Sequence, residues 1–126
     1  MSDLVFVSPF FIVANLKDSV SFYVDKLGFG VQFMGPEKGP YFAMVGRGPV
    51  SLMLKGGGGP VPNHTRYDWA RWDAYISVAD PDALYGEYRA AGVVFSQPLR
   101  DDTDNLRGFE VVDADGYVLF FGRPNV

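Results

Sequence analysis

One short stretch of the sequence combines side chains that bind planar or cationic molecules. It contains Tyr67, Asp68, Trp69, Trp72, Asp73 and Tyr75. A ring that holds a cation contributes about 0.5–2 kcal/mol, and a neighbouring carboxylate adds attraction where water is excluded. Aromatic residues make up 16% of the chain, which suits a ring-rich core, a ligand cleft, or both. Strand alternation assigns Trp72 to the core, so we expect Trp69 to be the better ligand contact.

The residue types that most catalytic sites require are scarce. The chain has no cysteine, which excludes a thiol nucleophile, a thiolate metal site and a disulfide framework. Its single histidine, His64, is expected to be an exposed loop residue, with a stray ligand or a general base as the alternative. Residues 113–116 (Asp-Ala-Asp-Gly) lack the further acids of a calcium-binding loop and indicate a hairpin turn. We assign no catalytic residue.

The elements that must position these residues occur twice in the same order. Each half predicts a strand, a helix and three further strands. In the first half these cover residues 4–13, 18–27, 29–34, 41–46 and 49–55. In the second half they cover residues 72–79, 81–91, 93–97, 107–112 and 117–122. Both predicted helices end at a glycine, Gly28 and Gly92, which supplies the left-handed residue that helix ends favour.

This repeat predicts an α+β fold of two tandem βαβββ modules. We expect one domain over residues 1–126, with module one at about 4–55, a glycine-rich linker at 56–70 and module two at about 71–122. One four-stranded sheet with one helix buries too little surface to be stable alone. The modules must therefore pair, within one chain or between two, as a curved mixed sheet around a shared cleft. That cleft is the natural ligand site.

Strand alternation predicts which side chains face the cleft, because a slip of one residue exchanges the two faces. Strand 72–79 sets a polar row opposite an apolar row that suits packing under a helix. The first strand and the last strands of the two modules are then matched to it through the repeat. The predicted cleft residues are Ser8, Phe10, Leu52, Asp73, Tyr75 and Phe120.

Composition limits the partners and the location. The formal net charge of −4 argues against a nucleic-acid partner, which requires clustered Lys and Arg. No apolar run approaches the length of about 18 residues that a spanning helix needs, and the N-terminus lacks the features of a signal peptide. We expect a cytoplasmic protein without a membrane partner.

Two motifs resemble those of one known superfamily. Residues 18–23 (Asp-Ser-Val-Ser-Phe-Tyr), followed by 27–29 (Leu-Gly-Phe), are similar to the first-helix signature of the vicinal-oxygen-chelate superfamily. Residues 107–109 (Arg-Gly-Phe) lead into 113–117 (Asp-Ala-Asp-Gly-Tyr), where that superfamily usually has Asp-Pro-Asp-Gly. The resemblance covers about residues 6–122. It implies the fold of the glyoxalases, bleomycin-resistance proteins and extradiol dioxygenases.

The resemblance also implies where a metal ion would bind. Metal-dependent members carry a His, Glu or Gln ligand on each of four strands, and those positions fall on Ser8, Leu52, Asp73 and Phe120. Only Asp73 could readily bind a metal, whereas a catalytic ion needs three or four N or O ligands. We therefore expect no metal and no other cofactor.

The nearest pattern is that of the metal-free bleomycin-resistance proteins, dimers whose clefts hold a cationic drug between aromatic rings. The resemblance implies a homodimer that binds a small aromatic or cationic compound, with drug sequestration as one role. Arg107 either anchors the nearby turn through a carboxylate or reaches a ligand anion. The expected ligand-binding residues are Ser8, Phe10, Leu52, Trp69, Asp73, Tyr75, Arg107, Phe109 and Phe120.

Two other functions are compatible with the sequence. A glyoxalase-type lyase or isomerase would use Asp73 or Glu110 as a base on an activated C–H bond, or an atypical metal site. A domain that only dimerises or regulates a partner would have a cleft filled by its own side chains. We favour a binding protein over an enzyme.

Overall fold

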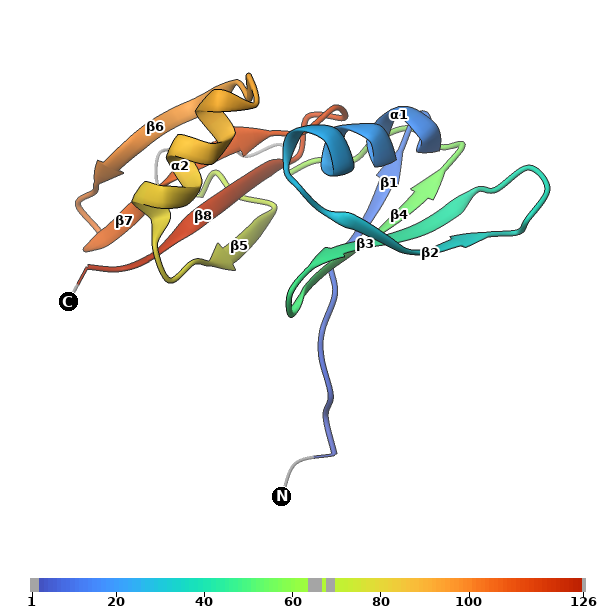
Figure 1. Ribbon diagram of the computed structural model, residues 1–126, viewed down its shortest axis with the longest axis horizontal. Helices are drawn as coiled ribbons and strands as arrows, with labels where there is room; N and C mark the ends of the chain where they lie inside the picture. The colour runs from blue at the N-terminus through green and yellow to red at the C-terminus, as the bar shows by residue number, and fades with distance from the viewer. Residues whose placement is uncertain (1–2, 64–66, 68–69, 126) are drawn as a thin grey trace.

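The computed structural model shows two four-stranded sheets side by side, each with its own helical segment (Figure 1). It describes residues 3–63, 67 and 70–125. Module one contains β1 (Phe10–Val13), α1 (Leu16–Ser21), the π-helical turn η1 (Phe22–Lys26), β2 (Gly30–Gly35), β3 (Phe42–Arg47) and β4 (Val50–Gly56). Module two contains β5 (Ala74–Ser77), α2 (Pro81–Ala90), β6 (Phe95–Asp101), β7 (Leu106–Val112) and β8 (Val118–Pro124). The predicted α+β fold class is confirmed.

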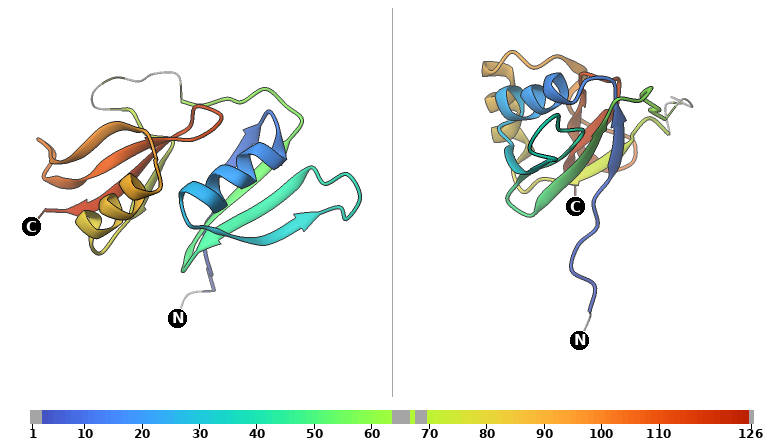
Figure 2. Two further views of the ribbon diagram at one scale, coloured as in Figure 1. Left: turned by 45° about the horizontal axis from the view of Figure 1, so that its top comes forward. Right: turned by 90° about the vertical axis from the view of Figure 1, so that its right-hand side faces the viewer.

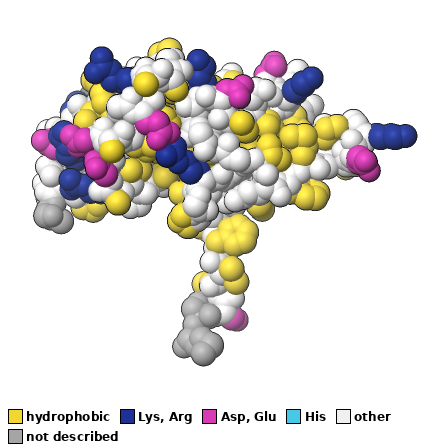
Figure 3. Space-filling model, viewed as in Figure 1, with side chains coloured by type: hydrophobic (Ala, Val, Ile, Leu, Met, Phe, Trp, Pro, Cys, Tyr) yellow, Lys and Arg dark blue, Asp and Glu magenta, His cyan; other side chains and the backbone are white. Residues whose placement is uncertain are grey.

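The first strand is shorter than the prediction of residues 4–13, because β1 begins at Phe10. The preceding residues leave the sheet as an arm that runs away from the body (Figure 1). Pro9 marks the point of departure, since its carbonyl accepts a hydrogen bond from the Met53 N–H and it has no N–H of its own. The arm carries exposed apolar side chains (Figure 3), namely Leu4, Val5, Phe6 and Val7.

The helices begin and end at residues whose chemistry favours those positions. Asn15 and Asp80 cap the N-termini of α1 and α2, where their side chains accept hydrogen bonds from the N–H groups of the third residue on. Gly28 and Gly92 follow the helical segments with φ of 73° and 77°, a conformation that favours glycine. The predicted helix ends are therefore confirmed at both glycines.

The strand order is β1-β4-β3-β2 in one sheet and β5-β8-β7-β6 in the other. In each sheet the first strand pairs in parallel with the last, and the remaining pairs are antiparallel. Each helix lies across one face of its sheet (Figure 2). We call this the helix face and the opposite side the open face. Residues paired across neighbouring strands share a face, so one assignment fixes the others in that sheet.

The two modules share one apolar core. The rings of Phe11 and Tyr117 stack across the junction, with centroids 4.1 Å apart and planes 4° apart. A buried hydrogen bond from the Tyr23 hydroxyl to Asp113 Oδ2 (2.6 Å) also crosses it. The structure thus pairs modules within one chain through their helices and through the turn before β8. None of the helices among the described residues combines the length and apolar character needed to cross a membrane.

Candidate functional site

Three aromatic rings form a cluster on the open face of module two. The Phe120 ring stacks on the Trp72 indole and on the Tyr75 ring, with centroids 4.3 and 5.5 Å apart. Tyr75 and Phe120 are paired residues of β5 and β8, so both point to the open face. Phe120 is buried beneath its neighbours, whereas Tyr75 remains 43% exposed. This ring cluster presents an aromatic surface on which a planar molecule could stack.

Two glycines make room for the central ring of the cluster. Gly108 and Gly122 are paired between β7 and β8, next to Phe120 on the same face. A Cβ added at Gly108 would lie 2.5 Å from Phe120 Cζ, and one added at Gly122 would lie 2.6 Å from Phe120 Cε2. Any side chain at either position would displace the ring. The glycine pair therefore determines where the Phe120 ring lies.

A buried carboxylate lies next to the ring cluster. Glu110, which is paired with Phe120, is 2% exposed. Its oxygens accept hydrogen bonds from Arg71 Nε (3.1 and 3.2 Å), Trp72 Nε1 (3.1 Å) and Ser96 Oγ (3.1 Å). A buried charge requires such partners to be tolerated. The network ties the indole and the segment before β5 to the middle of the sheet.

Asp73 has a structural task at the start of module two. Its Oδ2 accepts a hydrogen bond from the Val118 N–H (2.8 Å), and its Oδ1 accepts one from the Asn63 N–H. The carboxylate therefore joins β8 to the linker. The two carboxylates predicted as candidate bases, Asp73 and Glu110, are both engaged by protein donors.

A pocket of about 520 Å³ opens beside the ring cluster, within the usual range for small-molecule sites. Trp72, Glu110 and Phe120 line it, and the β6–β7 loop, residues 102–104, contributes two aspartates and a threonine. All its described lining residues come from module two and the segment before it. The Asp102 carboxylate accepts hydrogen bonds from backbone N–H groups of its own loop, which shapes this side of the pocket.

Module one carries a second aromatic group on its own open face. The Phe42 ring lies between those of Phe10 and Phe33, at centroid distances of 6.2 and 6.1 Å. The outer two are more than half exposed. Phe10 and Tyr75 hold equivalent places, because each pairs in parallel with the last strand of its module. The pocket beside the first cluster nevertheless contains neither Ser8 nor Phe10.

Comparison with known families identifies the chain. Residues 5–121 match the model of the Glyoxalase/Bleomycin resistance protein/Dioxygenase superfamily. The chain belongs to this superfamily. Among curated proteins, no sequence matches it.

Solved structures with the superfamily fold resemble the whole chain. The bleomycin-binding protein from bleomycin-producing Streptomyces verticillus, solved with copper(II)-bleomycin, is 28% identical with a TM-score of 0.71, covering 98% of both chains. TioX from Micromonospora sp. ML1 is 24% identical with a TM-score of 0.71, covering 94% of this chain and 98% of its own. A glyoxalase-related enzyme from Clostridium phytofermentans is 14% identical with a TM-score of 0.76, covering 98% and 99%. The last two likenesses show the fold alone.

The positions at which metal-dependent members of the superfamily hold an ion do not suit one here. The Ser8 hydroxyl donates to the Ser51 carbonyl (3.1 Å), Asp73 is held by backbone N–H groups, and Phe120 is hydrocarbon. Leu52 lies on the other face of its sheet. The described residues contain no group of three or more His, Asp or Glu side chains arranged to hold a metal.

The prediction that Leu52 and Phe109 face the cleft is wrong. They are 1% and 0% exposed and lie in the core on the helix faces. Phe10 pairs with Met53 as Tyr75 pairs with Phe120, so Met53 is the true counterpart of Phe120. The sequence repeat was matched one residue out of step, and such a slip exchanges the faces.

Arg107 also lies away from the ring cluster. Its guanidinium donates from Nε and Nη2 to the two Asp82 oxygens, both at 2.8 Å, and from Nη1 to Asp101 Oδ1 at 3.1 Å. These bonds fasten β7 to α2 and β6. The ion pair raises the pKa of Arg107 and lowers that of Asp82, chiefly through the hydrogen bonds between them. Arg107 therefore pairs with carboxylates, but it does not anchor the turn at residues 113–116 as predicted, because its partners are Asp82 and Asp101.

The assignment of Trp72 to the core was wrong for a local reason. Strand β5 begins at Ala74, so strand alternation does not extend back to residue 72, and the indole lies with the open-face ring of Phe120. Trp69 and His64 fall outside the described residues. Sequence reasoning missed Arg71 and Ser96, the partners of Glu110, because nothing in their spacing links them to β7.

Proposed function

We propose that the protein binds a small planar aromatic compound on the open face of module two, without a metal ion and without catalysis. The observation that carries this proposal is the ring cluster beside an open pocket, with Tyr75 still half-exposed. The two carboxylates predicted as candidate bases, Asp73 and Glu110, are occupied by protein donors, so neither is free to act as a base. Bleomycin, the ligand of the Streptomyces verticillus relative, supports the same class of function.

A positive charge on the ligand would favour binding. The pocket includes the β6–β7 loop, whose carboxylates Asp102 and Asp104 outnumber the exposed Arg100 guanidinium that also lines it, and the chain has a formal net charge of −4. The internal charge of Glu110 is met by Arg71, so the attraction comes from the exposed loop. Exposed charges are screened by salt, and the aromatic surface therefore supplies most of the affinity.

We also propose that the binding cleft is completed by a second copy of the chain. The exposed apolar arm at residues 4–7 and the exposed rings of Phe10 and Phe33 are surfaces that soluble monomers rarely leave open. A homodimer would cover them and set the open face of module one against that of module two. Sedimentation at tens of micromolar should show a dimer, and Phe33→Lys should shift it toward monomer. A wild-type monomer at that concentration would contradict this part of the proposal.

The ligand-binding proposal is tested by fluorescence titration with bleomycin and a panel of planar aromatic compounds. For a compound that binds, Tyr75→Ala should weaken affinity roughly 2- to 10-fold, the value of one ring contact. Tyr75→Phe keeps the ring and should bind like the wild type. Absence of any micromolar ligand across the panel would refute the proposal, as would equal affinities for Tyr75→Ala and Tyr75→Phe.

A further inference from the structure

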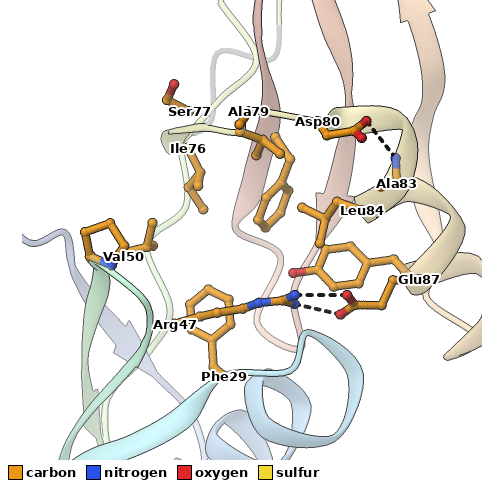
Figure 4. A pocket seen from close by; sticks show the side chains of 14 residues that line it. Phe29, Arg47, Val50, Ile76, Ser77, Ala79, Asp80, Ala83, Leu84 and Glu87 are labelled. Atoms are coloured by element: carbon orange, nitrogen blue, oxygen red, sulfur yellow. Dashed lines mark hydrogen bonds and ion pairs between the residues drawn. The ribbon is translucent and has the colours of Figure 1, made fainter.

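A second cavity, of about 400 Å³, lies between the two modules (Figure 4). Module one contributes residues that follow η1 and the β3–β4 hairpin, and module two contributes the end of β5, the start of α2 and part of β8. Its apolar walls come from both modules: Phe29, Val50, Ile76, Leu84, Tyr88 and Phe121. The volume lies in the usual range for small-molecule sites.

This cavity is separate from the ring cluster. Ile76 and Phe121 are paired residues that lie on the helix face of module two. Their immediate neighbours, Tyr75 and Phe120, point to the open face. Successive side chains of a strand project to opposite sides, so the sheet itself separates the two sites.

The charged side chains and the tyrosine hydroxyl that line the cavity all have hydrogen-bond partners within the protein. Arg47 donates from Nη1 and Nη2 to the Glu87 oxygens at 2.6 and 2.9 Å, and Figure 4 shows this pair at the edge of the cavity. The Tyr88 hydroxyl donates to the Leu27 carbonyl (2.9 Å), and Asp80 caps α2 through the Ala83 N–H. A charged or strongly hydrogen-bonding ligand would lose hydration here and compete with these existing bonds.

From these observations we propose that the inter-module cavity is a binding site for a small uncharged apolar molecule, aromatic or branched aliphatic. Such a ligand gains by leaving water for walls of ring and hydrocarbon. Because the walls belong to both modules, its binding stabilises their packing against each other. This site operates independently of any ligand on the open face.

The test uses N-phenyl-1-naphthylamine, an uncharged apolar probe that fluoresces when it leaves water. We expect saturable binding of one probe per chain with a Kd on the order of 100 µM or tighter. Ala83 lines the cavity from the exposed side of α2, so Ala83→Trp should fill it without disturbing the core. That variant should weaken probe binding about tenfold or more. Ala90→Trp, at the far end of α2 and outside the lining, is the matched control and should bind like the wild type.

Tyr75→Ala separates this inference from the function proposed for the open face. Unchanged probe binding in Tyr75→Ala, together with its loss in Ala83→Trp, supports the inter-module site. Loss in Tyr75→Ala with retention in Ala83→Trp would place the probe on the open face and overturn the inference, and so would the absence of saturable binding. Val50→Phe, which fills the cavity from the opposite wall, should reproduce the effect of Ala83→Trp; normal binding in both filled variants would refute the site.

Discussion

Replacing Glu110 by alanine tests whether its buried network holds the ring cluster in place. The substitution removes an acceptor of four hydrogen-bond contacts and leaves the Arg71 guanidinium and the Trp72 N–H without this partner. Removing one member of a buried ion pair costs about 3–5 kcal/mol. The Arg71 side chain is 23% exposed, so water can reach part of it, and we expect a loss of about 2–3 kcal/mol. For a chain of this length that loss lowers Tm by about 8–11 °C.

The assay is urea unfolding followed by circular dichroism and tryptophan fluorescence. Glu110→Ala should also shift the tryptophan emission maximum of the native protein to longer wavelength, because the Trp72 indole loses its hydrogen bond to Glu110. Asp104→Ala, an exposed residue of the same pocket, is the matched control and should change the free energy of unfolding by less than about 0.5 kcal/mol. If Glu110→Ala were as stable as this control, with unchanged emission, the network would have no part in positioning Trp72.

Three further predictions concern the core, the module junction and the surface. Leu52→Ala should lower the free energy of unfolding by about 2–4 kcal/mol because it empties a core position. Met53→Ala, on the open face, should lower it by less than about 1 kcal/mol. Urea titrations that give the reverse order would overturn the register of β4. Burial raises the pKa of Asp113 above its ordinary value, so the folded state binds this proton more tightly than the unfolded state does. The stability that comes from this pKa shift is then fully present below about pH 4 and is lost as the pH rises through the raised pKa. Asp113→Asn should remove this part of the pH dependence. Parallel curves of stability against pH for the wild type and the variant would contradict a raised pKa at Asp113. The side chains of the bidentate Arg47–Glu87 pair are both about half exposed. Glu87→Gln should therefore lower the free energy of unfolding by no more than about 0.5 kcal/mol in low salt, and by less in 1 M NaCl. A loss of stability that persists at high salt would show that the pair does not act through electrostatics.

Much of the fold could be predicted because its signals are local. Gly28 and Gly92 end helices because they adopt a left-handed backbone conformation that other residues disfavour. Asn15 and Asp80 cap helices through side chains that reach only a few residues along the chain. The order of strand and helix recurs in both halves, and that order alone indicates paired modules. The N-terminal strand was predicted too long, because an apolar run indicates a strand only where a neighbour supplies its hydrogen bonds.

The candidate site was predicted less completely than the fold. Tyr75 and Phe120 were placed on the open face, and the structure brings them together in one cluster with Trp72. Leu52 was assigned to the wrong face because it was matched to Phe120 in β8, where both alternating rows of the predicted strand are apolar and give no polarity signal. Its own strand does carry such a signal, since Ser51 and Lys55 mark the opposite row. For Phe109 the two rows of β7 each contain a charged residue, so polarity does not set the phase there. Register across strands, which depends on hydrogen bonds between distant residues, decided the matter.

The sequence by itself determined the superfamily, the βαβββ repeat and the lack of cysteine and of all but one histidine, since these depend on residue types and on short-range spacing. Tertiary structure decided that Glu110 is buried among Arg71, Trp72 and Ser96, that Arg107 binds Asp82 and Asp101, and that an apolar cavity lies between the modules beside their shared core. The physical reason is distance along the chain. A salt bridge, a stacked ring or a cavity wall joins residues that come together only when the sheets have formed, and no local pattern records which ones meet.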